Sequence, residues 1–133
     1  MKKLIGAFAL LFVAGCQTSP ISPENADPVP ASRLYGLQEG GEAKVIVTRD
    51  SGLYGSGCNV RLFVDGKLAG EFASGEVATF HVAPGQHVAG VKPSAACGGG
   101  SLAEREFIVG KGEAIRRRIS ITPGGIDFSP TAY

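Results

Sequence analysis

The strongest constraint on the fold is a regular alternation of short β-rich runs and turn residues from Ala43 onward. Runs of roughly six residues, rich in Val, Ile, Phe and Thr, are separated by Gly, Pro, Asp and Asn, which is typical of strands joined by turns. No run has the length and 3.6-residue period of an amphipathic helix. The expected strands are Lys44–Arg49, Asn59–Val64, Lys67–Phe72, Glu76–Val82, Gln86–Lys92, Glu104–Val109, Glu113–Ile121 and Ile126–Ser129.

Two details of this pattern indicate how the strands pair. Asp65-Gly66 separates two of the runs, and this dipeptide is a strong signal for a two-residue hairpin turn. Within the runs 59–64 and 76–82, alternate residues are apolar and are expected to face the core. We therefore predict an all-β fold, a small antiparallel sandwich of seven or eight strands, with an open barrel as the alternative.

Length and charge narrow the class of protein. The chain has 133 residues, enough for one domain. It carries 13 Lys plus Arg against 12 Asp plus Glu, a formal charge of +1. Nucleic-acid-binding domains carry a strongly basic surface, so this balance argues against a nucleic-acid partner.

The N-terminus is typical of an exported protein. Lys2 and Lys3 precede the apolar run Leu4–Gly15, whose 12 residues are too few for a membrane span of about 20. The run ends in Val13-Ala14-Gly15-Cys16, which resembles the lipobox of bacterial lipoproteins. The resemblance implies cleavage before Cys16 and acylation of Cys16, which anchors the chain in a lipid bilayer. In Gram-negative members of that class, an Asp after the Cys is the usual mark for retention in the inner membrane. Because Gln17 stands at this position, the resemblance implies the outer membrane, with the domain facing the periplasm.

The chain is expected to divide into three parts. Residues 1–15 are the signal peptide, 16–42 a lipid-anchored tether, and 43–133 the β-sandwich. The tether is expected to be disordered because its first half is rich in Pro, Ser and Ala and has no regular period. In residues 33–41 the apolar Leu34, Tyr35 and Leu37 leave open whether this segment docks on the domain edge.

Three cysteines are an odd number for an exported protein. If Cys16 is acylated, Cys58 and Cys97 remain, and an oxidising compartment allows them to form a disulfide. Two buried free thiols are the first alternative. Metal ligation is the second alternative, but the two cysteines lack C-x-x-C spacing and have no His cluster near them in the sequence, so they make a poor zinc site.

A second resemblance concerns the turns. The segments 64–70 (VDGKLAG) and 83–88 (APGQHV), followed by Gly112-Glu113, resemble the PEGA-type module. The resemblance covers about residues 43–121 and implies a seven-stranded, transthyretin-like sandwich. It rests on turn residues, so it implies a fold and no catalytic residues.

The sequence offers no recognisable catalytic site. It contains no nucleophile elbow, no phosphate-binding loop and no H-E-x-x-H motif. His81 and His87 flank a turn, which leaves a two-histidine metal site as the alternative to two surface histidines. We expect a protein that is not an enzyme and that has no cofactor and no metal.

Two features are candidates for binding a partner. Arg116 and Arg118 flank Arg117 in the run 113–121. Strict alternation places Arg117 on the same face as the isoleucines of this run. Burying its charge there is costly unless the strand bulges, lies at a sheet edge, or provides a partner for Arg117. The arginines then form either a solvated face or a docking patch. Leu53 and Tyr54 are apolar residues in a Gly-rich loop, which either binds a partner or merely connects strands.

These observations predict a non-catalytic outer-membrane lipoprotein that serves as a periplasm-facing interaction or envelope-structural module. Its expected partners are the lipid bilayer, through acylated Cys16, and an envelope protein. An inhibitor of a cell-wall hydrolase such as lysozyme, or a module that binds peptidoglycan or a small ligand, is the alternative.

Overall fold

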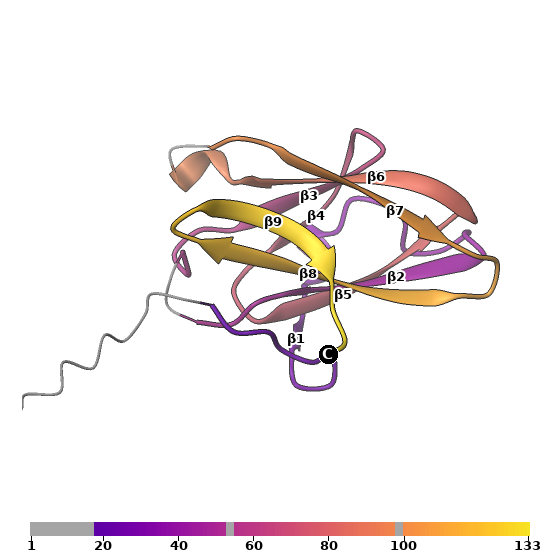
Figure 1. Cartoon of the computed structure of the whole chain (residues 1–133), viewed down its shortest axis with the longest axis horizontal. Helices are drawn as coiled ribbons and strands as arrows, with labels where there is room; N and C mark the ends of the chain where they lie inside the picture. Colours follow the sequence, from indigo (N-terminus) through magenta and orange to yellow (C-terminus); the bar gives the residue numbers. More distant parts are fainter. Residues whose placement is uncertain (1–17, 53–54, 98–99) are drawn as a thin grey trace, which may run out of the picture.

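Residues 18–52, 55–97 and 100–133 are described by a computed structural model, in which two β-sheets pack face to face (Figure 1). The strands are β1 (Asp27–Pro28), β2 (Ala43–Arg49), β3 (Val60–Val64), β4 (Lys67–Phe72), β5 (Glu76–Val82), β6 (Gly85–Pro93), β7 (Ala103–Val109), β8 (Ala114–Thr122) and β9 (Gly125–Pro130). Two single-turn 3-10 helices, η1 (Ala31–Arg33) and η2 (Ala95–Cys97), complete the described elements.

One sheet has the strand order β1-β5-β2-β8-β9 and the other β4-β3-β6-β7. The predicted all-β sandwich is confirmed, and each of the eight expected strands is present within two residues of its expected bounds. The Asp65-Gly66 hairpin is also confirmed. Both residues have positive φ, 50° and 79°, as a type I′ turn requires.

Alternation along the strands builds the core between the sheets. Val60, Leu62 and Val64 of β3 are buried, and so are the alternate residues Phe80 and Val82 of β5. Two aromatic contacts join the layers, Phe72 with Phe80 and Phe107 with Phe128, at centroid distances of 6.2 and 6.3 Å. Burying each such ring stabilises the fold by roughly 1.5–3 kcal/mol.

β8 lies inside its sheet. It pairs in parallel with β2 on one side and antiparallel with β9 on the other. Of the three arrangements that the sequence left open for the arginine run, the edge strand is therefore excluded. After β7 the chain crosses from one sheet to the other. There β8 pairs with the side of β2 that β5 does not occupy, and β8 runs parallel to β2.

The interpretation of residues 16–42 as a disordered tether is wrong for residues 18–42. β1 pairs in parallel with β5, Val29 is 6% exposed in the core, and Arg33 donates two hydrogen bonds to Glu76, of 2.8 and 2.6 Å. Beyond η1, Leu34 packs against the core. Apolar burial and these polar contacts offset the entropy lost when the segment is ordered.

The chain reaches β2 by passing very close to the end of β5. A Cβ added to Gly41 would lie 2.4 Å from the backbone nitrogen of Val82, a distance that real Cβ atoms do not show. We expect Gly41→Ala to lower the free energy of unfolding by roughly 1–3 kcal/mol, because the backbone of one segment has to move.

Urea unfolding of the purified protein measures this effect. Gly57→Ala is the matched control, since nothing lies within 4 Å of its added Cβ, and its change is expected to stay within about 0.5 kcal/mol. Equal stabilities of the two variants would show that the segment before β2 does not dock as described.

Candidate functional site

Three of the residues selected from the sequence, Cys16, Leu53 and Tyr54, lie outside the described residues. The predicted disulfide is confirmed, with Cys58 and Cys97 bonded and their Cα atoms 5.7 Å apart. It ties the loop after β2 to the segment after β6 at one end of the sandwich. We call this end the disulfide end.

A buried arginine organises the same end. Arg49, the last residue of β2, is 2% exposed. Its guanidinium donates to the backbone carbonyls of Cys58, Phe72 and Gly55, the last two at 2.7 and 2.8 Å. Burial lowers the pKa of Arg49, against the charges of Glu76 and Asp50, which raise it. Arg49 therefore supplies donors to carbonyls of two chain segments that the sandwich buries there.

The next residue, Asp50, is also buried, and its carboxylate collects three contacts. Arg118 donates to both carboxylate oxygens, at 3.0 and 2.6 Å, and the Thr18 hydroxyl donates at 2.9 Å. The Thr18 hydroxyl also lies 3.2 Å from the Ile121 carbonyl, and Ser19 and Ser51 form a small antiparallel bridge. Thr18, where the described chain begins, is thus bound to the disulfide end.

The two other arginines of the run differ in surroundings. Arg116 is exposed and lies 3.6 Å from Glu24. Arg117 is half-buried opposite Val47 of β2, where burial lowers its pKa, and its guanidinium donates to the Arg116 carbonyl at 2.9 Å. A partner-binding role for Arg116 and Arg118 stays a prediction. The guanidinium of Arg118 forms an ion pair with Asp50 within the domain.

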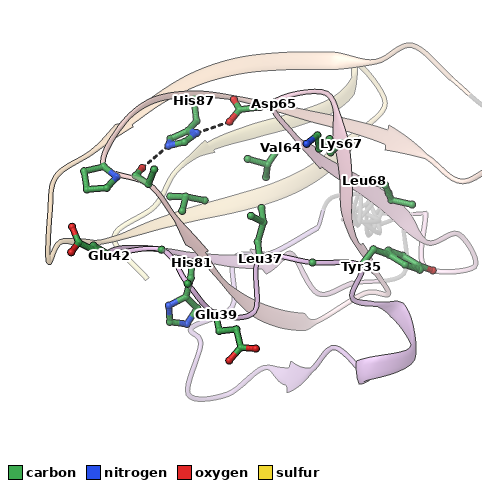
Figure 2. Close-up of a pocket in the computed structure, with 16 residues that line it drawn as sticks. Tyr35, Leu37, Glu39, Glu42, Val64, Asp65, Lys67, Leu68, His81 and His87 are labelled. Atoms are coloured by element: carbon green, nitrogen blue, oxygen red, sulfur yellow. Dashed lines mark hydrogen bonds and ion pairs between the residues drawn. The ribbon is translucent and has the colours of Figure 1, made fainter.

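A concave surface lies at the opposite end of the sandwich (Figure 2). It has a volume of about 610 Å³ and opens between two walls. One wall is the segment 35–42, which we call the strap; it runs from η1 to β2. The other consists of the β3–β4 turn and the β5–β6 turn. We call this surface the strap pocket.

The strap is held at few points. The Tyr35 amide donates to the Ala69 carbonyl of β4 at 3.0 Å, and the Leu37 carbonyl accepts from the His81 amide of β5 at 2.7 Å. The strap therefore bridges strands of both sheets. Sequence reasoning noted the apolar residues of this segment but could not place them, because their contacts are with strands more than 30 residues away.

An ion pair closes one side of the strap pocket. His87 Nδ1 lies 2.6 Å from Asp65 Oδ2, and His87 Nε2 lies 2.6 Å from the Ala83 carbonyl oxygen. The Asp65 carboxylate also accepts from the Val88 amide at 2.9 Å, and the His87 ring stacks on Phe107 with centroids 5.3 Å apart. Figure 2 shows the imidazole between the two turns.

Both ring nitrogens of His87 face acceptors, which suits the doubly protonated imidazolium. Burial lowers the pKa of His87, but the hydrogen bonds to Asp65 and Ala83 and the Asp65 charge outweigh burial, so the pKa lies above its usual value. For Asp65, burial raises the pKa, while the contacts with His87 and the Val88 amide outweigh it and lower the pKa. The pair therefore fastens two turns together, and it leaves no free nitrogen lone pair for a base or a metal ligand.

Within 18–52, 55–97 and 100–133, no three His, Cys, Asp or Glu side chains gather so that they could hold a metal ion. In the same ranges, no helix has the length and apolar character needed to span a bilayer. His81 and His87 both line the strap pocket.

No protein-family model, no curated protein and no solved structure matches this chain. The resemblances to bacterial lipoproteins and to PEGA-type modules therefore remain expectations from the sequence.

The His87–Asp65 pair makes stability depend on pH. The folded-state pKa of His87 lies above the unfolded value of about 6.5, so its contribution is complete below that pH and is lost as the pH rises through the folded pKa. The contribution of Asp65 is present above about pH 4 and is lost as the pH falls through its lowered folded pKa. We expect His87→Gln to cost roughly 1 kcal/mol between these limits, and less at higher pH.

Urea unfolding from pH 3 to 9 tests this for the wild type, His87→Gln, Asp65→Asn and the double variant. The two single losses are expected to be non-additive near pH 5.5, because each removes the same contact. Profiles that run parallel over the whole pH range would contradict the assignment.

Proposed function

We propose that this protein is a lipid-anchored, non-catalytic interaction module of the bacterial envelope, and that the strap pocket is its binding surface. The lipid is attached at Cys16 and the domain faces the periplasm. The bound partner is another envelope component.

The observation that carries this proposal is the position of Thr18. Its hydroxyl contacts the buried carboxylate of Asp50, at the end of the sandwich opposite the strap pocket. One residue, Gln17, separates Thr18 from Cys16. Because a residue spans at most about 3.6 Å, the Cα of Cys16 lies within roughly 7 Å of the Cα of Thr18, so an acylated Cys16 keeps the disulfide end close to the lipid.

This attachment orients the domain. In Figure 1 the described chain begins at the same end as the β8–β9 turn, while the β7–β8 turn lies at the far end. The strap pocket lies near the β7–β8 turn, because Lys111 of this turn is 3.9 Å from Glu42 of the pocket lining. β2, with seven residues at about 3.3 Å each, separates the two ends by roughly 20 Å. A lipid-anchored domain held in this way presents the strap pocket to the periplasm rather than to the bilayer.

The alternative of a hydrolase inhibitor drew on the loop 51–54, whose Leu53 and Tyr54 lie outside the described residues. No contact among the described residues favours that alternative. Purified protein added to a lysozyme turbidity assay would reveal such an activity directly.

The anchor is tested with Cys16→Ala expressed beside the wild type in a Gram-negative host. We expect the wild type to incorporate labelled palmitate and to fractionate with the outer membrane. The variant is expected to do neither, because its acylated sulfur is gone. Crosslinking affinity purification from the same membranes is expected to enrich an envelope protein with the wild type only. Equal fractionation of both proteins would overturn the anchor, and enrichment of lipid alone would overturn the interaction role.

The orientation is tested with the acylated protein in vesicles that contain headgroup spin-labelled lipid. A fluorescent unnatural side chain is placed at Gly124 near the disulfide end or at Lys111 near the strap pocket; both residues are exposed. We expect strong quenching from Gly124 and weak quenching from Lys111, since nitroxide quenching acts over short distances. Equal quenching at both positions would show that the domain tumbles on its anchor.

A further inference from the structure

We propose that the strap pocket binds an extended peptide segment of a partner protein, with an apolar side chain between the strap and the β3–β4 turn and a basic residue next to it. The inference rests on the proposed function, since it assumes that the module acts by binding. It names the chemical class of the partner surface.

The shape and lining of the strap pocket suit an apolar side chain. Its volume of about 610 Å³ lies within the usual range of ligand pockets, about 300–1,000 Å³. Figure 2 shows Leu37 pointing across the opening toward Val64, with Tyr35 and Leu68 farther along the same opening. Tyr35 is 49% exposed and Leu37 37% exposed, so both present apolar surface to an incoming group.

The backbone of Leu37 points to the same role. Its φ is 63°, in the left-handed region that a leucine rarely adopts. Gly36 and Gly40, both with positive φ, lie on either side of it. An exposed leucine held in a strained conformation gains little from its own domain. Such strain is typical of sites that display a side chain for binding.

The strap also offers main-chain donors. Among the described residues, the amides of 37–41 donate no hydrogen bond, although the Leu37 carbonyl accepts one from His81. Residues 37–40 are exposed, so the backbone of a bound extended peptide can accept hydrogen bonds from these amides, as it does when a peptide pairs with a sheet edge. A lipid chain or a flat hydrophobic patch would leave these donors without partners.

The charged residues that line the strap pocket indicate which residue of the peptide lies next to its apolar side chain. Asp65 is already paired with His87, while Glu39 and Glu42 stand on the strap side of the opening, with Lys67 on the opposite side. Glu42 has only a long contact of 3.9 Å with Lys111, and both of these side chains are largely exposed. The strap side is therefore acidic and complements a lysine or arginine of the peptide.

The test uses the full acylated protein in nanodiscs and three labelled hexapeptides with blocked ends. Gly-Lys-Leu-Lys-Leu-Gly carries both expected features, Gly-Glu-Leu-Glu-Leu-Gly reverses the charge, and Gly-Lys-Ser-Lys-Ser-Gly lacks the apolar groups. We expect fluorescence polarisation to show at least about tenfold weaker binding of the second and third peptides than of the first.

Protein variants locate the binding. Leu37→Gly removes the side chain, and glycine suits the positive φ at this position, so we expect the variant to keep the fold. Its affinity for the first peptide is expected to be at least about tenfold lower than that of the wild type. Glu39→Gln with Glu42→Gln is expected to reduce the preference for the basic over the acidic peptide. Ile108→Ser is the matched control, because Ile108 is 70% exposed and does not line the strap pocket, and it is expected to leave binding unchanged.

A photo-reactive leucine in the first peptide gives an independent readout. Crosslinks are expected within 35–42 and 64–68. Crosslinks elsewhere, equal binding of the three peptides, or no binding of any peptide would overturn this inference. If palmitate labelling of Cys16 succeeds in the same preparation, that failure concerns the peptide site and not the anchor. Peptide binding in a preparation whose Cys16 takes up no palmitate would leave the peptide site standing and overturn the anchor.

Discussion

Two consecutive buried charges at the end of β2 hold one end of this sandwich together. Arg49 donates to carbonyls of the loop after β2 and of the end of β4. Asp50 accepts from Arg118 of β8 and from Thr18. Each charge is costly to bury alone, and each is offset only when its partners from other segments are in place. The disulfide between Cys58 and Cys97 restrains the same region covalently.

This arrangement separates two tasks along the long axis of the domain. The disulfide end receives the N-terminal segment, and the chain beside it carries the cysteine that resembles a lipidation site. The far end carries the strap pocket, and one of its walls consists of two turns that His87 and Asp65 fasten together. In the function we propose, the rigid sandwich between them converts a lipid attachment at one end into a fixed direction at the other.

The sequence was sufficient to predict the strands, but it was not sufficient to predict that the segment before β2 docks on the sandwich. Strand positions follow from alternation and from turn residues such as Asp65-Gly66, which are local signals. Val29, Leu34 and Leu37 are isolated apolar residues among Pro, Ser and Gly, so no period marks them. Their docking depends on an open edge between β4 and β5 that exists only once both sheets have formed.

By itself the sequence predicted the all-β class, eight of the nine strands that the structure describes, the two-residue hairpin at Asp65-Gly66 and, as one of three alternatives, a disulfide between Cys58 and Cys97. Each of these rests on short-range chemistry or on simple counting. Only the tertiary structure decided that β8 lies in parallel beside β2, that Arg49 and Asp50 are buried, and that residues 18–42 lie along the domain to form the strap pocket. These features join residues far apart in the chain. Their free energy comes from burial and from partners that no local pattern contains.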